Sequence, residues 1–257
     1  MKVISFVNQK GGVAKTTSCL NIGAALARAG KKVLLVDMDP QGSLTLHAGI
    51  SGLNGQVTLY EALKGEADIN AAIRTKHGSA DYDVLPVDFR MSAAEQQLSG
   101  KIGKEVLLKK ALEKLKKKYD FVLIDCGPSL NLLTIMALAA SDRYVIPVTA
   151  QYMPLAGIAQ LETTASMVKE YLNSKLKLTG VIIAAYDSRR TMDKEIVRNI
   201  QDHFPGKVFS TFVKNNSKLA EAPTFGKDIF EYAPKSAGAE AYTDIANELI
   251  RREGKKQ

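Results

Sequence analysis

The 257-residue sequence has little or none of several features that would assign it to a class at once. Its only cysteines are Cys19 and Cys126, too few for a disulfide framework or a zinc site made of cysteines. No apolar run approaches the roughly 18 residues that span a bilayer. We find no internal repeat, no low-complexity linker and no signal-peptide pattern before the first strand. We therefore expect a cytoplasmic protein in which residues 1–257 form a single domain.

The composition is that of a globular protein with an excess of positive charge. Hydrophobic residues make up 46% of the chain and charged residues 24%, and the net charge of +8 suits a polyanionic partner. Much of the excess lies in residues 101–120, which hold eight lysines and three acidic residues. Apolar residues recur there at helical spacing, so a helix with a solvated lysine face is favoured over a nucleic-acid contact.

Short runs rich in Val, Ile and Phe alternate with longer helical patterns. Several of these runs are apolar throughout, which is typical of strands buried on both faces of a parallel sheet. We expect an α/β fold, a doubly wound and mostly parallel sheet with helices on both faces. The expected strands are residues 2–7, 32–36, 82–87, 121–124, 143–147, 178–184 and 207–212, and the expected helices are residues 16–29, 104–117, 130–140, 158–172, 193–203 and 237–252.

A glycine-containing loop follows the first expected strand. Residues 10–17 read KGGVAKTT, and a helical pattern begins at their end. Glycines at such a turn let backbone N–H groups surround an anion at the positive end of the helix. A lysine and a hydroxyl then reach the outer phosphates and a magnesium ion. The usual G-x-x-x-x-G-K-[ST] pattern is not met, since Gln9 and Ala14 occupy its two glycine positions.

This variant loop resembles the deviant Walker A motif of the ParA/MinD ATPases, which are P-loop NTPases. Further segments resemble motifs of this family in the same order along nearly the whole chain. They are residues 33–42 (VLLVDMDPQG), 121–130 (FVLIDCGPSL), 186–189 (YDSR), 222–227 (APTFGK) and 232–242 (YAPKSAGAEAY), the last three being similar to the Soj-like ParA branch. The resemblance implies an ATP hydrolase that uses Mg²⁺.

The resemblance also assigns roles to the loop residues. Backbone amides of Gly11, Gly12, Val13 and Ala14 would surround the phosphates. Lys15 would neutralise the β- and γ-phosphates, Thr16 would hold Mg²⁺, and Thr17 would reach the α-phosphate. Lys10 matches the signature lysine of the family, which reaches the nucleotide of the partner in a dimer.

Three aspartates complete the expected catalytic site. Asp125 ends an apolar strand and would bind the Mg²⁺ shell. By resemblance, Asp37 supports the metal site and Asp39 positions the attacking water. Two residues depart from the family pattern. Ala14 replaces a glycine, which is tolerable at negative φ and unfavourable at positive φ. Gly127 stands where proline is frequent, and we expect it to loosen the segment after Asp125.

Two branches of the family remain as alternatives, and a metal-cluster carrier is a further one, although neither Cys19 nor Cys126 looks like a cluster ligand. The MinD branch binds membranes through a C-terminal amphipathic helix, but here the apolar residues after Ala237 have core spacing, and the tail beyond Arg252 has no bulky apolar residue. The Soj-like branch grips DNA phosphates at positions matched by Arg189 and Lys218. A set of neighbouring basic residues would widen that patch: Arg190, Lys194, Arg198 and Lys214.

We therefore expect an ATPase that dimerises with ATP and binds DNA without sequence preference. No helix-turn-helix pattern precedes the first strand, so we expect no operator-reading domain. A ParB-like partner would stimulate hydrolysis, no membrane contact is expected, and the protein would associate with the nucleoid. The cargo stays open: a plasmid, a chromosome, a protein cluster or a microcompartment.

Overall fold

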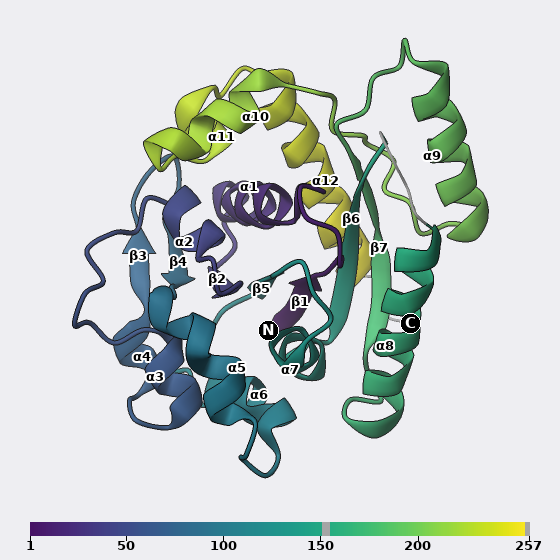
Figure 1. Ribbon diagram of the computed structural model, residues 1–257. Helices are drawn as coiled ribbons and strands as arrows, with labels where there is room; N and C mark the ends of the chain where they lie inside the picture. Colours follow the sequence, from purple (N-terminus) through teal and green to yellow (C-terminus); the bar gives the residue numbers. More distant parts are fainter. Residues whose placement is uncertain (151–154, 255–257) are drawn as a thin grey trace.

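A seven-stranded sheet runs through the middle of the molecule, with helices on both sides (Figure 1). The computed structural model describes residues 1–150 and 155–254. The strand order is β3-β4-β2-β5-β1-β6-β7, and all neighbours pair in parallel except β3 and β4. The strands are β1 (Lys2–Phe6), β2 (Val33–Met38), β3 (Arg74–Lys76), β4 (Tyr82–Leu85), β5 (Phe121–Cys126), β6 (Arg143–Thr149) and β7 (Lys177–Ala184).

The helices vary widely in length. Five have at least nine residues: α1 (Lys15–Arg28), α7 (Leu132–Ala140), α8 (Leu155–Tyr171), α9 (Thr191–His203) and α12 (Ala237–Gly254). The short ones are α2 (Ser43–His47), α3 (Leu59–Lys64), α4 (Ile69–Ala72), α5 (Ala94–Leu98), α6 (Leu107–Leu112), α10 (Ser217–Glu221) and α11 (Ile229–Tyr232). Three 3₁₀ turns are also present: η1 (Phe89–Ala93), η2 (Lys104–Val106) and η3 (Ala222–Phe225).

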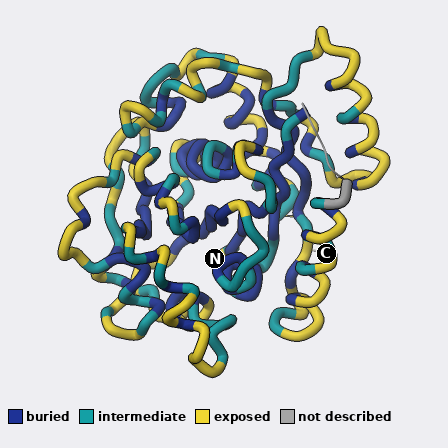
Figure 2. Tube along the Cα trace, viewed as in Figure 1, coloured by how far each residue is buried: buried dark blue, intermediate teal, exposed yellow. Residues whose placement is uncertain are grey.

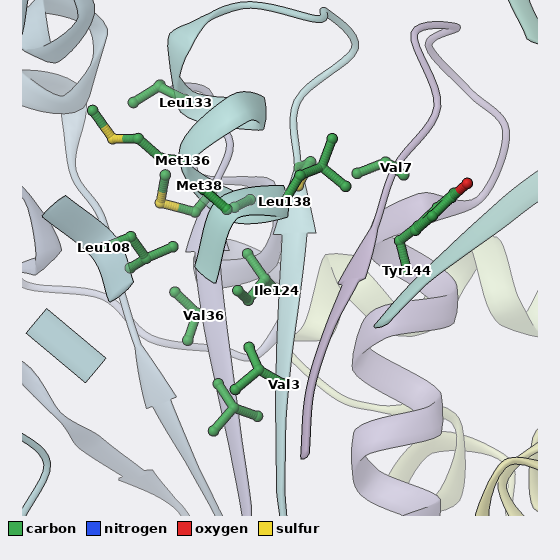
Figure 3. Packing of buried hydrophobic residues seen from close by; sticks show 14 of the residues in the cluster. Val3, Val7, Val36, Met38, Leu108, Ile124, Leu133, Met136, Leu138 and Tyr144 are labelled. Carbon is green, nitrogen blue, oxygen red and sulfur yellow. The ribbon is translucent and has the colours of Figure 1, made fainter. Parts of the chain in front are cut away.

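Two hydrophobic layers enclose the sheet because successive side chains of a strand point to opposite faces. In β2, Leu34 and Val36 belong to the layer of α7 and α8, whereas Val33 and Leu35 belong to the layer of α1 and α12. Figure 2 shows the strands as buried and the outer sides of α8 and α9 as exposed. Figure 3 shows Met136 of α7 packed close to strand residues such as Met38. The expected doubly wound sheet is confirmed.

Residues 207–212, expected as a strand, form no strand in the structure. They run beside β7 and make a single bridge, Val208 with Val181. The reason lies in the register of the hydrogen bonds. The Lys207 carbonyl accepts from the N–H of Val181, and the N–H of Phe209 donates to the carbonyl of Val181. The carbonyl of Ile183 then accepts from the N–H of Val213 and not from that of Thr211, which a continuous parallel ladder would use.

Two further expectations about the elements are corrected. The helix expected over residues 104–117 is a 3₁₀ turn followed by α6, which ends at Leu112. Asn70 explains the early end, because its side chain donates to the carbonyl of Lys114 and accepts from the N–H of Lys116, turning the chain toward β5. The edge strand β3 was not expected, since its three residues are too few to show a period.

We predict that Gly180→Ala destabilises the protein by about 2 kcal/mol, because it overpacks the contact between β7 and residues 207–209. A Cβ on residue 180 would lie 2.4 Å from the carbonyl oxygen of Lys207 and 2.5 Å from Nη1 of Arg252. Urea unfolding followed by circular dichroism measures the change. Gly157→Ala on α8 is the matched control, since its Cβ would meet no atom within 4 Å. Equal midpoints for the two variants would contradict the packing argument.

Candidate functional site

The loops that follow β1, β2 and β5 meet at one edge of the sheet. These strands are neighbours in the order β2-β5-β1, and all three are parallel. In the register, Asp125 near the end of β5 stands between Asp37 of β2 and Phe6 of β1. Ligands of open α/β sheets bind outside the carboxyl ends of the strands. The sequence motifs therefore converge on the edge where a ligand is expected.

The loop between β1 and α1 is held in place by its own polar groups. The Asn8 side chain accepts from the N–H of Lys10 and donates to the carbonyl of Pro147 at 2.8 Å. Lys15 Nζ donates to the carbonyl oxygen of Lys10, also at 2.8 Å, across the loop. Val13 points into the core and is 3% exposed. These contacts fix a curved backbone before α1 begins.

The first turn of α1 is suited to an anion. Ala14 is the N-cap residue, but its side chain gives no capping hydrogen bond, and the first turn has no acidic residue. The N–H groups of a helix start that lack a side-chain cap carry partial positive charge. A phosphate group at this position would accept from several of them. An anion at residues 10–17 is thus compatible with the start of α1, and the phosphate role of these residues stays a prediction.

Lys15 brings a cation into this nearly closed region. The residue is 7% exposed, and burial lowers the pKa of its ammonium group, while Asp125 and Asp39 oppose that shift. An anionic ligand would attract the Lys15 ammonium strongly, because burial weakens the screening of their charges by water.

Thr16 and Asp125 form the contact expected of a magnesium site. Thr16 Oγ1 donates to Asp125 Oδ2 at 2.7 Å, and Oδ1 of Asp125 is buried without a hydrogen-bond partner. Burial and the neighbouring Asp37 raise the pKa of Asp125 well above its usual range. Mg²⁺ prefers hard oxygen ligands and keeps several waters. A hydroxyl and an orphaned carboxylate oxygen fit such an ion, which would lower that pKa.

The protein side chains alone do not form a full metal cage. Within residues 1–150 and 155–254, no group of three or more His, Cys, Asp or Glu side chains converges on one point. A magnesium ion at Thr16 would therefore complete its shell with water and phosphate oxygens, as is usual for Mg²⁺ bound with nucleotides.

Asp37 is engaged in organising the loop after β2. Its Oδ1 accepts from the N–H of Asp39, and its Oδ2 accepts from both the N–H and the hydroxyl of Thr45. Burial raises the pKa of Asp37 to about 7, although these hydrogen bonds oppose the shift. Thr45, which sequence reasoning missed, also accepts from the N–H of Val87. Its spacing of eight residues from Asp37 carries no periodic signal.

Asp39 lies at the turn after β2 and is 7% exposed. Its Oδ1 accepts from the N–H of Gln41. A Cβ on residue 127 would lie only 3.2 Å from this oxygen. Gly127, one of the two departures from the family pattern, therefore leaves the Asp39 carboxylate room that a larger residue would take away.

Ala14, the other departure, has a φ of 64°. This left-handed conformation is the unfavourable one of the two cases considered for alanine, because its Cβ approaches the following carbonyl. The loop nevertheless keeps an αL turn at this position, where glycine would be free of that strain.

Arg189 and Lys218 lie on segments that the fold brings side by side. Tyr186 forms a bridge with Lys214, and the N–H of Asn215 donates to the carbonyl of Tyr186. Both cations are paired with acids that sequence reasoning did not weigh. Arg189 forms a bidentate contact with Asp187, and Lys218 pairs with Glu221 at 2.9 Å.

The remaining expectations from sequence concern the cysteines and the membrane. Cys19 and Cys126 are both free and buried, so they form no disulfide. Across the described chain, no helix has the length and apolar character needed to cross a membrane. The tail at residues 255–257, part of the sequence argument against a C-terminal anchor, lies outside the described residues.

Comparison with known proteins decides the family. A family model described as an AAA domain matches residues 1–178. The chain is 43% identical to the sporulation initiation inhibitor protein Soj of Bacillus subtilis, covering 96% of this chain and 98% of that protein. It is 42% identical to the chromosome-partitioning ATPase Soj of Treponema pallidum, covering 99% of both. The chain belongs to the Soj/ParA family of chromosome-partitioning ATPases.

Solved structures agree with the Soj/ParA fold. A cobyrinic acid a,c-diamide synthase from Mycobacterium smegmatis, solved with ADP and magnesium, has a TM-score of 0.88 and 34% identity over 100% of this chain and 97% of its own. A putative plasmid partition protein from Borrelia burgdorferi bound to AMPPNP has a TM-score of 0.81 and 25% identity over 98% of this chain and 99% of its own.

We predict that Ala14→Gly stabilises this Soj/ParA protein by about 1 kcal/mol, because it relieves the left-handed strain. Ala27→Gly, further along α1, is the matched control and should destabilise by about 1 kcal/mol, since glycine is unfavourable inside a helix. Thermal and urea unfolding of both variants measure the two signs. A loss of stability in Ala14→Gly would show that the loop does not need the αL conformation.

Proposed function

We propose that this ATPase is an ATP-driven switch that positions a cargo along DNA. ATP and Mg²⁺ bind at residues 10–17, two subunits then associate, and the dimer holds DNA without sequence preference until hydrolysis releases it. The observation that carries the proposal is the hydrogen bond between Thr16 and Asp125 beside an uncapped helix start. The two side chains would hold magnesium, and the helix start would bind phosphate.

The loop residues bind and orient the nucleotide. Backbone N–H groups of Gly11, Gly12, Val13 and Ala14 donate to phosphate oxygens, and Thr17 reaches the α-phosphate. Lys15 leaves the carbonyl of Lys10 and turns to the β- and γ-phosphates, where its charge is less costly than in the present buried position. Thr16 and Asp125 hold Mg²⁺, which supplies charge neutralisation when bound.

Asp37 and Asp39 have different tasks in this scheme. Asp37 is held by Thr45 and by the N–H of Asp39, so it sets the position of the loop after β2 and supports the metal site from the side of Asp125. Asp39 accepts one backbone N–H and keeps carboxylate oxygen capacity for the attacking water. Its task is to orient that water toward the γ-phosphate.

Lys10 acts between subunits. It precedes the loop glycines, and its backbone N–H and carbonyl are fixed by Asn8 and Lys15. In a dimer, its side chain would reach the nucleotide of the second copy. A cation supplied in trans would screen two γ-phosphates that face each other and stabilise charge in the transition state.

The DNA contact is proposed for the surface formed by residues 186–190 and 214–218. Arg189 is 88% exposed in its side chain and Lys218 49%, so both can exchange their acidic partners for phosphate oxygens. Arg190, Lys194, Arg198 and Lys214 widen this basic surface. Dimerisation doubles the number of such contacts, which links DNA affinity to ATP.

The partner and the location follow from this scheme. A ParB-like protein would stimulate hydrolysis and release the DNA, and the ATPase would work on the nucleoid in the cytoplasm, with residues 1–257 acting as one domain. A MinD-like membrane role is less supported, because the MinD structure from Pyrococcus furiosus is 26% identical to this chain, against 38–43% for the partition relatives.

We predict that Asp39→Ala binds ATP and dimerises but hydrolyses it about 100-fold more slowly, because the water is no longer oriented. Phosphate release measures turnover, and light scattering with ATP measures the dimer. Lys10→Ala is the contrasting variant: it should bind ATP yet stay monomeric. Wild-type turnover in Asp39→Ala would move the water-positioning role to another residue, with Asp37 the first candidate.

Paired substitutions test the DNA surface. Arg189→Ala with Lys218→Ala should lower the slope of log affinity against log salt by about 2 per protomer, since each cation contacts one phosphate. Asp187→Asn with Glu221→Gln should raise the affinity, because it frees the same two cations. Fluorescence anisotropy with unrelated duplexes and ATP measures both. If both pairs bind like wild type, the DNA surface lies elsewhere.

A further inference from the structure

The side chain of Thr45 on α2 connects two segments at the edge of the sheet where the nucleotide site is proposed. Its hydroxyl donates to Asp37 Oδ2 at 2.7 Å and accepts from the N–H of Val87 at 3.1 Å. The residue is 2% exposed, so bulk water offers these groups no alternative partner. Thr45 therefore joins the end of β2 to the segment that follows β4.

Thr45 also supplies two of the three donors that surround the Asp37 carboxylate. Its N–H donates to Oδ2 at 2.8 Å beside its hydroxyl, and the N–H of Asp39 donates to Oδ1 at 3.1 Å. Hydrogen bonds to an ionised acceptor are strong, and three of them on two oxygens hold the carboxylate in one orientation. Loss of the hydroxyl would remove one of the three and leave the buried N–H of Val87 without its acceptor.

The turn that carries Asp39 is anchored on this carboxylate. The N–H of Asp39 is held by Asp37 Oδ1, and two bonds then close the turn. The carbonyl of Asp39 accepts from the N–H of Gly42, and its side chain accepts from the N–H of Gln41. A rotation of the Asp37 carboxylate therefore shifts the backbone of this turn and, with it, the carboxylate of Asp39.

The far end of α2 is braced against η3. A Cβ on residue 49 would lie 2.6 Å from the carbonyl oxygen of Gly226, and a Cβ on residue 226 would lie 2.6 Å from Cα of Gly49. Two backbones can approach this closely only where both residues are glycine. The N–H of Ile50 donates to the carbonyl of Thr45 and ties the brace to that residue. The hydroxyl of Thr45 thus acts from a fixed support.

We propose that Thr45 is a positioning residue for ATP hydrolysis, whose hydroxyl holds Asp37 so that Asp39 presents its carboxylate to the attacking water. The proposal rests on the proposed function in taking Asp39 as the residue that orients this water. It adds a residue that acts through Asp37 and needs no contact with the nucleotide. A displacement of about 1 Å at an orienting group can cost about 100-fold in rate, so a small rotation of Asp37 is measurable in turnover.

The groups proposed to bind ATP lie on other elements. Residues 10–17 belong to the loop after β1 and the start of α1, and Asp125 belongs to β5. The hydrogen bonds of the Thr45 hydroxyl reach only Asp37 and the N–H of Val87. Loss of the hydroxyl should therefore lower kcat more than it raises the KM for ATP, which is the pattern of a group needed in the transition state.

The test compares three substitutions in the full chain. Thr45→Val keeps the shape of the side chain and removes the hydroxyl, whereas Thr45→Ser keeps the hydroxyl. Thr179→Val is the matched control, because Thr179 is 7% exposed and its hydroxyl donates to Glu253 Oε1 at 2.9 Å, near the start of β7 and away from the proposed site. Thermal unfolding verifies that each variant is folded. If Thr45→Val does not fold, Thr45→Ala takes its place, since it also lacks the hydroxyl and adds no methyl group.

Phosphate release over a range of ATP concentrations at saturating Mg²⁺ measures kcat and KM. We expect Thr45→Val to lower kcat about tenfold while KM changes less than about twofold. Thr45→Ser should stay within about threefold of the wild-type kcat, and Thr179→Val should match wild type. In an Asp39→Ala background, Thr45→Val should lower kcat by less than about twofold more, because the group that it positions is already gone.

The outcomes separate the role of Thr45 from the proposed function. Wild-type kcat in Thr45→Val, an equal loss in Thr45→Ser or Thr179→Val, or a full further loss in the Asp39→Ala background overturns the role of Thr45. The water-orienting role proposed for Asp39 fails in a different way, since Asp39→Ala would then itself hydrolyse ATP at the wild-type rate. A slow Thr45→Val in that case places the effect on Asp37 alone and overturns its link to Asp39.

Discussion

Thr16 on the first turn of α1 and Asp125 at the end of β5 are joined by a hydrogen bond of 2.7 Å, in a region where the carboxylate is fully buried. Buried charge without compensation is costly, and here one carboxylate oxygen lacks a partner. The surrounding groups partly offset this cost. Lys15 lies close enough to lower the pKa of Asp125, and Asp37 beside it is held by three hydrogen bonds. The site is thus poised for a cation and a polyanion together.

The doubly wound sheet explains how one small protein separates several tasks. Loops after β1, β2 and β5 meet at the strand ends, where we propose the nucleotide site. The turn after β7 carries Arg189 at the same edge, close to the segment of Lys218. The opposite end of the strands holds a cavity lined by Arg143, Lys177 and Arg252 of α12. Since α12 packs against α1, which starts at the phosphate loop, the two edges share a rigid connection.

Departures from the family pattern have structural meaning at two positions. Ala14 adopts a φ of 64°, so the backbone is locally strained in the loop that we propose to bind phosphate. Gly127 leaves space beside Asp39, where an added Cβ would lie 3.2 Å from the carboxylate. Both positions border groups with assigned chemistry, and neither removes a reactive group.

The sequence by itself determined the order of strands and helices along most of the chain and the family, and it predicted the phosphate loop. These features are local: contiguous residues such as 10–17 carry the chemistry, and period-two and helical spacing mark the elements. Tertiary structure alone decided that the pairing of residues 207–212 with β7 loses its register after Phe209, that Thr45 holds Asp37, and that Asp187 and Glu221 pair with Arg189 and Lys218. Local periodicity does not record the geometry of side-chain contacts, above all of those between segments distant in the chain. Only the folded chain therefore shows which hydrogen bonds and charges are already satisfied.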